Sequence, residues 1–412
     1  MDIPDLLHAV LKLPKSGWEI VAVQIEESKE TLFVELEYES GMPLICPECG
    51  SDCSGHIYDH CERTWRHKDL CEYRTLLHAE VPRVSCKKCK RVIMIDVPWS
   101  DKQMRITRSF ERQLVNGCIL MPISDVRQLY HVSWYTICNA LERTINKLLK
   151  NKAYDTIRTI GVDEIAIHKG HEYLTLVYDL DKSEVIWIGK DRTCATLLDF
   201  ISWFGVDKFK QLDAVCCDMW DPFIKAITQY VAPSKIVFDK FHIKQHLNVA
   251  VDKTRRMEHK ELLEIGQTDL THTKYLWLKN PSRLTVSQQL TFKELRKKNL
   301  KVLRAYELKE LFSHFWNYTS STWAEKFFND WYWAATHSRL DPVVKVAKML
   351  KRYWYGVVSY LKNPITNATS EGINSKIRVY TKRAFGFRTF EMFRNIVFLG
   401  CGGLSIDPFK SS

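Results

Sequence analysis

The chain has 412 residues, which is too long for a single ordinary domain and suits two to four modules. Its formal net charge is +11, and such a basic balance favours polyanionic partners because Lys and Arg displace the counterions condensed on phosphates. No signal peptide opens the sequence and no apolar run is long enough to span a bilayer, so we expect a cytoplasmic protein. In that reducing compartment, the 13 cysteines favour metal ligands and buried thiols over disulfides.

The first forty residues predict a short helix and two strands, because WEIVAVQIEE and TLFVELEYE alternate apolar and polar residues. Two CxxC pairs come next, formed by Cys46, Cys49, Cys86 and Cys89. Each pair can present two thiolates to one ion, and two pairs make the closed four-cysteine site of a structural Zn²⁺. Buried free thiols are the alternative, and a neighbouring cysteine could replace one ligand: Cys53, Cys61 or Cys71. We therefore predict a zinc ribbon in an N-terminal α/β segment of residues 1–100.

Residues 106–150 predict helices throughout, because apolar residues recur at three- and four-residue steps in ITRSFERQLVNGCIL, SDVRQLY and SWYTICNALERTINKLLK. Ser124 and Ser133 are the expected N-caps of the second and third helices. With Tyr130-His131-Val132 as the turn, residues 101–153 would form a helix-turn-helix DNA-binding domain. A plain helical hairpin that packs two domains together is the alternative. The residues expected to meet a DNA groove open the third helix: Ser133, Trp134, Tyr135 and Thr136.

From about residue 157 the pattern becomes β-rich, with three strands at IRTIGVDEIAI, EYLTLVYDL and EVIWIGKD joined by short links. Helices and strands then alternate to residue 258, with buried strands at DAVCCDM and KIVFD. A meander followed by alternating helices and strands predicts the mixed α/β sheet of a ribonuclease H-like fold.

Residues 259–360 contain no strand-like run and are helical, Trp-rich and basic, so we predict an all-helical insertion into that fold. The last long helical pattern starts near Asn367 and runs to about residue 399, with a break expected around Phe385-Gly386. The chain is therefore predicted to be a multidomain α/β protein, and its last segment holds the final helix of the core and a basic C-terminal stretch. The expected domains are 1–100, 101–153, 154–258, 259–360 and 361–412.

Two aspartates lie in strands that are otherwise apolar. Asp163 is in the middle of IGVDEIAI, and Asp218 is at the end of DAVCCDM. A carboxylate among apolar side chains is costly unless it is paired or ligates something. Strands in this order can be neighbours, so the two carboxylates can converge and bind a hard cation such as Mg²⁺. A capping or ion-pairing role is the alternative.

Three further residues could belong to such a site. Glu371 opens the last long helix, where a favourable interaction with the helix dipole is a sufficient explanation on physics alone. Asp239 and His242, in VFDKFHIKQH, follow the next strand and could support the metal ligands. A pair that supports the ligands from outside the metal site, or that caps the helix, is the preferred alternative to direct participation for these two residues.

From Lys376 to Arg394 the chain carries six basic residues against one acidic residue, Glu391, with phenylalanines between them. This pattern fits a helix that packs its aromatic side chains inward and shows phosphate-binding charges outward. A solvated helix face is the alternative. The residues expected to bind DNA in this stretch are Lys376, Arg378, Lys382, Arg383 and Arg388.

Taken together, these segments resemble the bacterial insertion-sequence transposases of the ISL-three (ISL3) family over nearly the whole chain. In the N-terminal part the resemblance rests on CPECG, RTWRHKDL, VPRVSC and VPW. It continues in GVDEIAIHKGHEYLTLVYDL, CDMWDPF, FDKFHIKQH, LRAYELKELF and SEGINSKIRVYTKRAFGFR. Lys90 departs from the pattern, because a ribbon often has Gly after its second CxxC pair.

The resemblance implies a DDE transposase with a ribonuclease H-like catalytic fold, a zinc ribbon and a helix-turn-helix. By position, Asp163, Asp218 and Glu371 match the family's three acidic residues, which would hold two catalytic Mg²⁺ or Mn²⁺ ions. Asp239 and His242 match an aspartate-x-x-histidine pair seen after the second catalytic strand in several DDE groups. A basic patch after the first strand would contact DNA and corresponds to His168, Lys169 and His171.

Such an enzyme would bind the terminal inverted repeats of an insertion sequence, cleave a strand at the element end and join the released 3′-hydroxyl to target DNA. It would act on double-stranded DNA, on the bacterial nucleoid, as a homodimer or a larger assembly. Two alternatives stay open. One is a DNA-binding regulator with an inactive ribonuclease H scaffold, and the other is a nuclease that cuts without joining.

Overall fold

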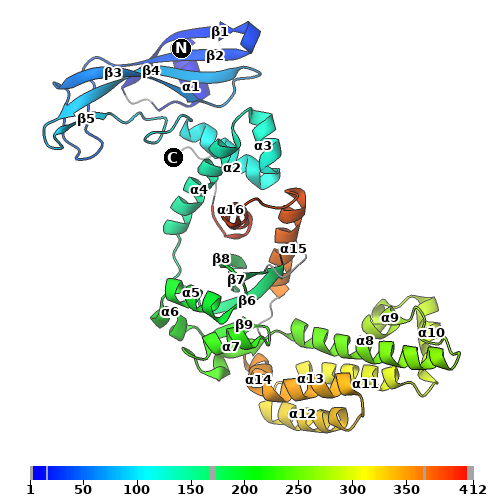
Figure 1. The fold of residues 1–412 in the computed structure, drawn as a ribbon. Coiled ribbons are helices and arrows are strands. Elements are labelled where there is room, and N and C mark those ends of the chain that lie inside the picture. Colours follow the sequence, from blue (N-terminus) through cyan, green and yellow to red (C-terminus); the bar gives the residue numbers. More distant parts are fainter. Residues whose placement is uncertain (1–2, 15–16, 167–172, 365–367, 406–412) are drawn as a thin grey trace. The chain divides into compact units, whose positions relative to one another are not determined.

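The computed structural model describes residues 3–14, 17–166, 173–364 and 368–405. The chain divides into two compact units, and Figure 1 labels most of their helices and strands. The first unit holds Met1–Asn151, Tyr380–Gly400 and Leu404–Ser412, and the second holds Lys152–Val379 and Cys401–Gly403. No helix in the described part of the chain is long and apolar enough to cross a membrane.

A five-stranded sheet, preceded by helix α1 (Ile3–Leu11), forms the N-terminal part of the first unit. Its strands are β1 (Trp18–Glu26), β2 (Thr31–Tyr38), β3 (Ile57–Arg66), β4 (Arg74–Cys86) and β5 (Arg91–Met94), and the 3-10 turn η1 (Glu27–Lys29) joins the first two. The order is β1-β2-β4-β3, with β5 paired to β4. Strands β2 and β4 run parallel and the other neighbours run antiparallel. The predicted N-terminal helix and its two following strands are confirmed.

Three helices follow in the first unit: α2 (Arg108–Leu120), α3 (Ile123–Tyr130) and α4 (Trp134–Lys150). Helix α3 ends at His131, whose φ of 50° lies in the left-handed region that often terminates a helix. Ser133 caps α4 by accepting a hydrogen bond from the backbone N–H of Thr136. The three predicted helices and the Ser133 cap are confirmed. The predicted Ser124 cap is wrong, because α3 already begins at Ile123, whose side chain is buried, and Ser124 therefore lies inside the helix.

The second unit is built on another five-stranded sheet, of order β10-β9-β6-β7-β8. Its strands are β6 (Thr159–Ala166), β7 (Tyr173–Asp179), β8 (Glu184–Lys190), β9 (Ala214–Cys217) and β10 (Ile236–Phe238). The first three form an antiparallel meander, and β9 and β10 run parallel to β6. The connecting elements are α5 (Cys194–Phe204), α6 (Val206–Gln211), α7 (Asp221–Ile227) and the 3-10 turn η2 (Pro233–Lys235). The predicted mixed sheet is confirmed, and α6 is the one connecting helix that the pattern did not predict.

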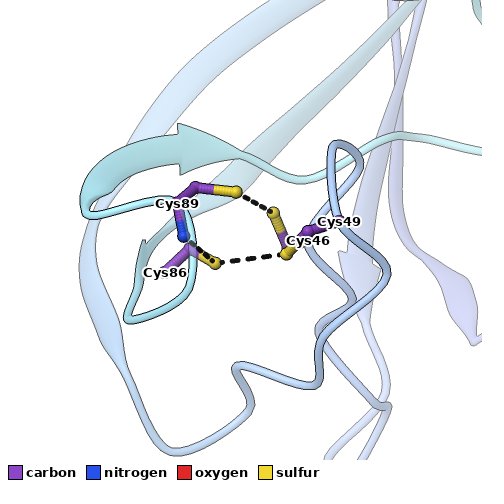
Figure 2. Close-up of side chains that lie close together, drawn as sticks. All are labelled: Cys46, Cys49, Cys86 and Cys89. Atoms are coloured by element: carbon purple, nitrogen blue, oxygen red, sulfur yellow. Dashed lines mark hydrogen bonds between the residues drawn. The ribbon is translucent and has the colours of Figure 1, made fainter.

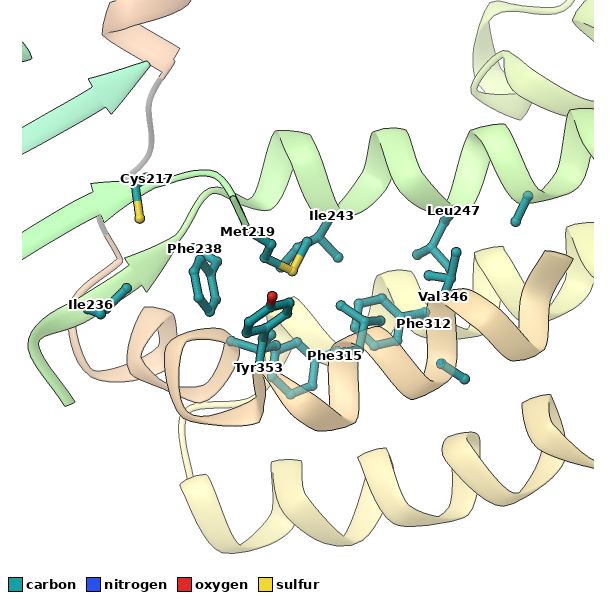
Figure 3. Close-up of a cluster of buried hydrophobic side chains, with 14 of the residues drawn as sticks. Cys217, Met219, Ile236, Phe238, Ile243, Leu247, Phe312, Phe315, Val346 and Tyr353 are labelled. Carbon is teal, nitrogen blue, oxygen red and sulfur yellow. The ribbon is translucent and has the colours of Figure 1, made fainter. Parts of the chain in front are cut away.

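From Lys240 to Lys362 the chain is helical and contains no strand, as predicted for residues 259–360. The elements are α8 (Lys240–Glu264), α9 (Lys274–Leu278), η3 (Pro281–Arg283), α10 (Val286–Arg296), α11 (Lys301–Ser313), η4 (His314–Asn317), α12 (Ser321–Thr336), α13 (Asp341–Arg352) and α14 (Trp354–Lys362). Figure 3 shows side chains from α8, α11 and α13 meeting in the core, among them Leu247, Phe312 and Val346. That core continues to Phe238 at the end of β10.

Close contacts join these helices to the edge of the sheet. A Cβ on Gly356 of α14 would lie 2.3 Å from the Phe238 ring of β10, so only glycine allows this approach. Within the helices, Glu258 of α8 accepts hydrogen bonds from the backbone N–H groups of Lys301 and Val302 at 2.6 and 2.7 Å, which caps α11. These contacts hold the end of β10, and therefore the residues that follow it, against a packed helical layer.

The last two helices are α15 (Ala368–Arg383) and α16 (Phe390–Cys401). Phe385 and Gly386, which lie between them, have φ angles of 52° and 100°, in the left-handed region that a continuous helix cannot contain. The predicted break in the last helical pattern is therefore confirmed.

Candidate functional site

Four cysteine thiols converge in the first unit, as Figure 2 shows. Cys46 and Cys49 come from the turn before β3, and Cys86 and Cys89 come from the turn between β4 and β5. The four sulfur atoms lie within 4.8 Å of one another, with 3.9 Å between Cys46 and Cys89 and 3.5 Å between Cys49 and Cys86. A tetrahedral Zn²⁺ with bonds of about 2.3 Å spaces its sulfurs about 3.8 Å apart. The four predicted thiols therefore fit a structural zinc ion.

The neighbouring cysteines do not take part in this cluster. Among the described residues, the four thiols are the one group of three or more His, Cys, Asp or Glu side chains whose ligand atoms lie this close together. Cys53 donates to the carbonyl of Ser51, Cys61 donates to a neighbouring carbonyl, and Cys71 is exposed. Hydrogen bonds with Ser51 lower the pKa of the Cys49 thiol to about 6, whereas burial raises the pKa of Cys46 and the hydrogen bond with Cys49 raises that of Cys89 to about 12.

In the second unit, three aspartates lie level with one another on parallel strands: Asp163 within β6, Asp218 directly after β9 and Asp239 directly after β10. Cys216 of β9 pairs with Gly161 of β6 on one side and with Val237 of β10 on the other. Two residues beyond this row, each strand reaches an acidic side chain: Asp163, Asp218 and Asp239. The parallel register therefore brings together the two aspartates predicted as metal ligands and the one predicted beside them.

The three aspartates also share one face of the sheet. The residues three positions before them point into the main hydrophobic core: Ile160, Val215 and Ile236. Because successive strand residues point to opposite faces, the aspartates face away from that core. All three line a cavity of about 580 Å³ on this other side.

Asp163 is largely buried in the middle of β6. Its Oδ1 accepts a hydrogen bond from the backbone N–H of Glu164 at 2.8 Å, and its Oδ2 accepts one from the side-chain amide of Asn374 at 2.7 Å. Burial raises the pKa of Asp163, while these two bonds and the nearby His242 act in the opposite direction. Each carboxylate oxygen keeps a further lone pair, so the Asp163 carboxylate can still coordinate a cation in the cavity.

His242, in the first turn of α8, lies among the three aspartates. Its ring nitrogens are 3.8 Å from an oxygen of Asp218 and 4.0 Å from oxygens of Asp163 and Asp239. Asp239 also caps α8, because its Oδ1 accepts a hydrogen bond from the backbone N–H of Phe241 at 3.1 Å. The preferred alternative for Asp239, a helix cap, is therefore present, and both members of the predicted pair also line the cavity.

A stacked arginine that the sequence patterns did not predict lies beside this row. Arg192, in the loop between β8 and α5, bonds Glu164 at 2.7 Å. Its guanidinium lies over the rings of Tyr173 and Trp220, 3.8 and 4.7 Å from their centroids. The Trp220 indole N–H donates to the Arg192 carbonyl at 3.0 Å. Because Glu164 directly follows Asp163 and Trp220 lies two residues after Asp218, Arg192 links the two segments that carry these aspartates.

Glu371, in the first turn of α15, lines the same cavity. Its side chain is exposed and makes no hydrogen bond or ion pair with another described residue. Asn374, one turn later, donates to Asp163 and accepts a hydrogen bond from the hydroxyl of Tyr178 on β7. Arg378, one turn further, also lines the cavity. Asn374 was not predicted, although its three-residue spacing from Glu371 places both side chains on one helix face.

The residues predicted to open the DNA-recognition helix differ in their exposure. Tyr135 is 74% exposed. Ser133 is occupied as the cap of α4, and its hydroxyl lies 2.8 Å from that of Thr136. Trp134 is half-buried beneath Arg388, whose guanidinium is 5.0 Å from a ring centroid of the indole. Of the four predicted residues, Tyr135 is therefore the one whose side chain is most available to a DNA groove.

The basic residues predicted to bind DNA fall into both units. Lys376 and Arg378 are exposed on the part of α15 in the second unit, and Lys382 is exposed near the end of that helix. Arg383 donates to the last two carbonyls of α2 at 3.0 and 2.7 Å, so its charge stabilises a helix C-terminus. Three further predicted DNA contacts lie outside the described residues: His168, Lys169 and His171.

Three families match consecutive parts of the chain. Residues 43–89 match the zinc-finger of transposase IS204/IS1001/IS1096/IS1165. Residues 95–145 match the helix-turn-helix domain of transposase family ISL3. Residues 160–397 match the DDE domain of the ISL3 family, which is described as a transposase.

Curated relatives align with most of the chain. The transposase for insertion sequence element IS1001 from Bordetella parapertussis is 26% identical over 384 residues, which cover 92% of this chain and 94% of the relative. The transposase for insertion sequence element IS1557 from Mycobacterium tuberculosis is 26% identical over 368 residues, which cover 84% of this chain and 82% of the relative.

A zinc ribbon, a helix-turn-helix and a mixed α/β domain with an acidic cleft, in this order, define a DNA transposase. The chain belongs to the ISL3 family of transposases, since the transposase family alone matches more than half of it. The predicted family, zinc ribbon and helix-turn-helix are therefore confirmed.

Proposed function

We propose that the second unit is a ribonuclease H-like catalytic core with a helical insertion, and that it cleaves and joins DNA at the ends of an insertion sequence. The observation that carries the proposal is the level row of Asp163 and Asp218 on parallel strands, facing a cavity that Glu371 also lines. The sheet order supports the fold, because an antiparallel meander is extended by two parallel strands. Membership of a DDE transposase family supports the chemistry.

Asp163, Asp218 and Glu371 are the proposed ligands of two Mg²⁺ or Mn²⁺ ions. Carboxylate oxygens are hard donors that suit these cations, and no cysteine is among the described residues that line the cavity. The side chain of Glu371 is exposed, so it can turn toward an ion without breaking a bond to another described residue. When bound, the ions would activate an attacking water or 3′-hydroxyl and stabilise the leaving oxygen of an in-line displacement.

The other residues of the cavity would orient the acids and hold the DNA. Lys240, Lys244 and Arg378 line it and supply positive charge for a phosphodiester backbone. Asp239 and His242 would support the ligands, Asp239 by ordering the start of α8 and His242 by lying between the carboxylates. The protein would thus contribute position and charge, with no covalent protein–DNA intermediate.

The zinc ribbon and the helix-turn-helix would bind the terminal inverted repeats, with Tyr135 at the exposed start of the recognition helix. Both ends of an element must be held together, so we expect a homodimer or a larger assembly on DNA. The proposed domains are 1–100, 101–153, 154–258, 259–360 and 361–412. Helix α8 runs without a break through the boundary at 258, and the compact units divide at residues 151 and 380.

The test uses isosteric variants of the three acids. Asp163→Asn, Asp218→Asn and Glu371→Gln should each abolish cleavage of an end-labelled duplex that carries an element end, in Mg²⁺ and in Mn²⁺. Binding of the same duplex should persist in mobility-shift assays. Asp213→Asn is the matched control, because Asp213 is exposed and precedes β9 at the end opposite Asp218. The control should cut like the wild type.

The other outcomes revise either the site or the function. A variant of one of the three acids that cuts at the wild-type rate removes that residue from the site. Wild-type protein that binds element ends and never cuts them would be a regulator with an inactive scaffold. Cleavage without joined products would identify a nuclease instead of a transposase.

A further inference from the structure

Two consecutive hydrogen bonds link strand β7, helix α15 and strand β6. The hydroxyl of Tyr178 donates to Oδ1 of Asn374, and Nδ2 of Asn374 donates to Oδ2 of Asp163 at 2.7 Å. Tyr178 is fully buried and Asn374 is 5% exposed, so water has little access to either bond. Tyr178 pairs with Gly161 across the antiparallel strands, and Gly161 lies two residues before Asp163. The side chains of Tyr178 and Asp163 therefore lie on the same face of the sheet.

The chemistry of the carboxylate dictates the direction of both bonds. An ionised carboxylate can only accept, so the amide of Asn374 must present Nδ2 to Asp163 and Oδ1 to Tyr178. Tyr178 must then donate, and burial raises its pKa well above the ordinary value of 10, so the phenol keeps its proton. The buried hydroxyl therefore orients the amide, and the amide orients the carboxylate.

We infer that Asn374 is a positioning residue for the metal-binding carboxylates, an inference that rests on the proposed function. Its amide holds Asp163 so that the remaining lone pairs face the cavity, and the same side chain anchors α15 one turn after Glu371. Asn374 thereby fixes the position of Asp163 on the sheet relative to Glu371 on the helix. Removing a side chain that hydrogen-bonds a metal ligand typically costs about 10- to 100-fold in metal affinity or activity.

The test titrates Mn²⁺ into the zinc-loaded full-length protein by calorimetry. Asn374→Ala should weaken Mn²⁺ binding by about 10- to 100-fold. Tyr178→Phe should weaken it by less, because the amide stays but loses the bond that orients it. Ser375→Ala is the matched control, since Ser375 is the next residue on α15, is exposed and does not line the cavity. The control should bind Mn²⁺ like the wild type.

A second readout separates positioning from a general loss of structure. In the cleavage assay, the defect of Asn374→Ala should shrink as the Mn²⁺ concentration rises, and the DNA concentration at half-maximal rate should stay unchanged. Loss of structure would lower the rate at every metal concentration and would also lower the melting temperature of the second unit.

The outcomes distinguish this inference from the proposed function. If Asn374→Ala binds Mn²⁺ like the wild type while Asp163→Asn no longer binds it, the positioning role is wrong and the proposed metal site stands. If Asp163→Asn also binds Mn²⁺ like the wild type, the proposed site falls and the positioning role falls with it. Should Asn374→Ala fail to fold, Tyr178→Phe decides, because it removes one hydroxyl and leaves Asp163 untouched. Wild-type Mn²⁺ affinity in that variant would then refute the role of the two bonds.

Discussion

Lowering the pH should weaken the first unit through one buried histidine. His67 follows β3 and is 2% exposed. Its Nε2 lies 3.0 Å from the carbonyl of Leu11 at the end of α1, and its Nδ1 lies 2.9 Å from the hydroxyl of Thr107, the N-cap of α2. A carbonyl can only accept, so Nε2 carries the ring proton and Nδ1 accepts from Thr107. The neutral ring therefore satisfies both partners and joins α1 and α2 to the sheet.

Protonation of this ring is unfavourable in the folded protein. Burial lowers the pKa of His67 from 6.5 to about 4. The unfolded chain binds more protons than the folded chain between these two values, so the stability is fully present above pH 6.5 and falls as the pH drops toward 4. The difference between a pKa of 6.5 in the unfolded chain and about 4 in the folded chain corresponds to about 3 kcal/mol of unfolding free energy, of which about 2 kcal/mol is lost by about pH 5.

Two measurements check this value. Nuclear magnetic resonance should show the ring of His67 titrating near pH 4. In denaturant unfolding of the zinc-loaded protein, the wild type should lose about 1 kcal/mol more than His67→Gln between about pH 7.5 and about pH 5.5. Both proteins share the proton uptake that accompanies zinc loss, so the comparison cancels that contribution. A His67 resonance that titrates near 6.5, or equal losses in the two proteins, would refute the reasoning.

Two other predictions separate structural roles from DNA contacts in the first unit. Strong chelation of zinc should unfold about the first hundred residues, because zinc would join the turn before β3 to the turn after β4. The second unit should stay folded. Limited proteolysis that finds both units still protected would contradict this prediction. Arg383→Gln should lower the stability of the first unit by about 1–3 kcal/mol, because the last carbonyls of α2 lose two charge-assisted hydrogen bonds. Its exposed neighbour provides the control: Lys382→Gln should leave the melting temperature unchanged and lower the salt dependence of DNA binding by about one phosphate contact. A reduced salt dependence with an unchanged melting temperature in Arg383→Gln would instead make Arg383 a DNA contact.

Much of the site could be predicted where a few neighbouring residues carry the information. The spacing within each CxxC pair predicts two thiolates on one turn, and helical periodicity with Ser133 as a cap predicts the helix-turn-helix. Asp163 and Asp218 stood out because each is an acid at an apolar strand, and the parallel register then placed them level with each other. Glu371 is different, since its position at a helix start has an ordinary electrostatic explanation and only the family resemblance selected it.

The sequence by itself therefore indicated the family from contiguous motifs. It also indicated the four clustered cysteines, the three helices of the helix-turn-helix and the two aspartates at apolar strands, because each of these patterns lies within single turns, helices or strands. Only the tertiary structure decided which side chains surround the acids and which basic residues are already occupied. Asn374 reaches Asp163 across 211 residues of sequence, and Arg383 reaches the end of α2 across more than 260. Hydrogen bonds between segments so far apart leave no period in the sequence, and they become visible only when folding brings the partners within about 3 Å of each other.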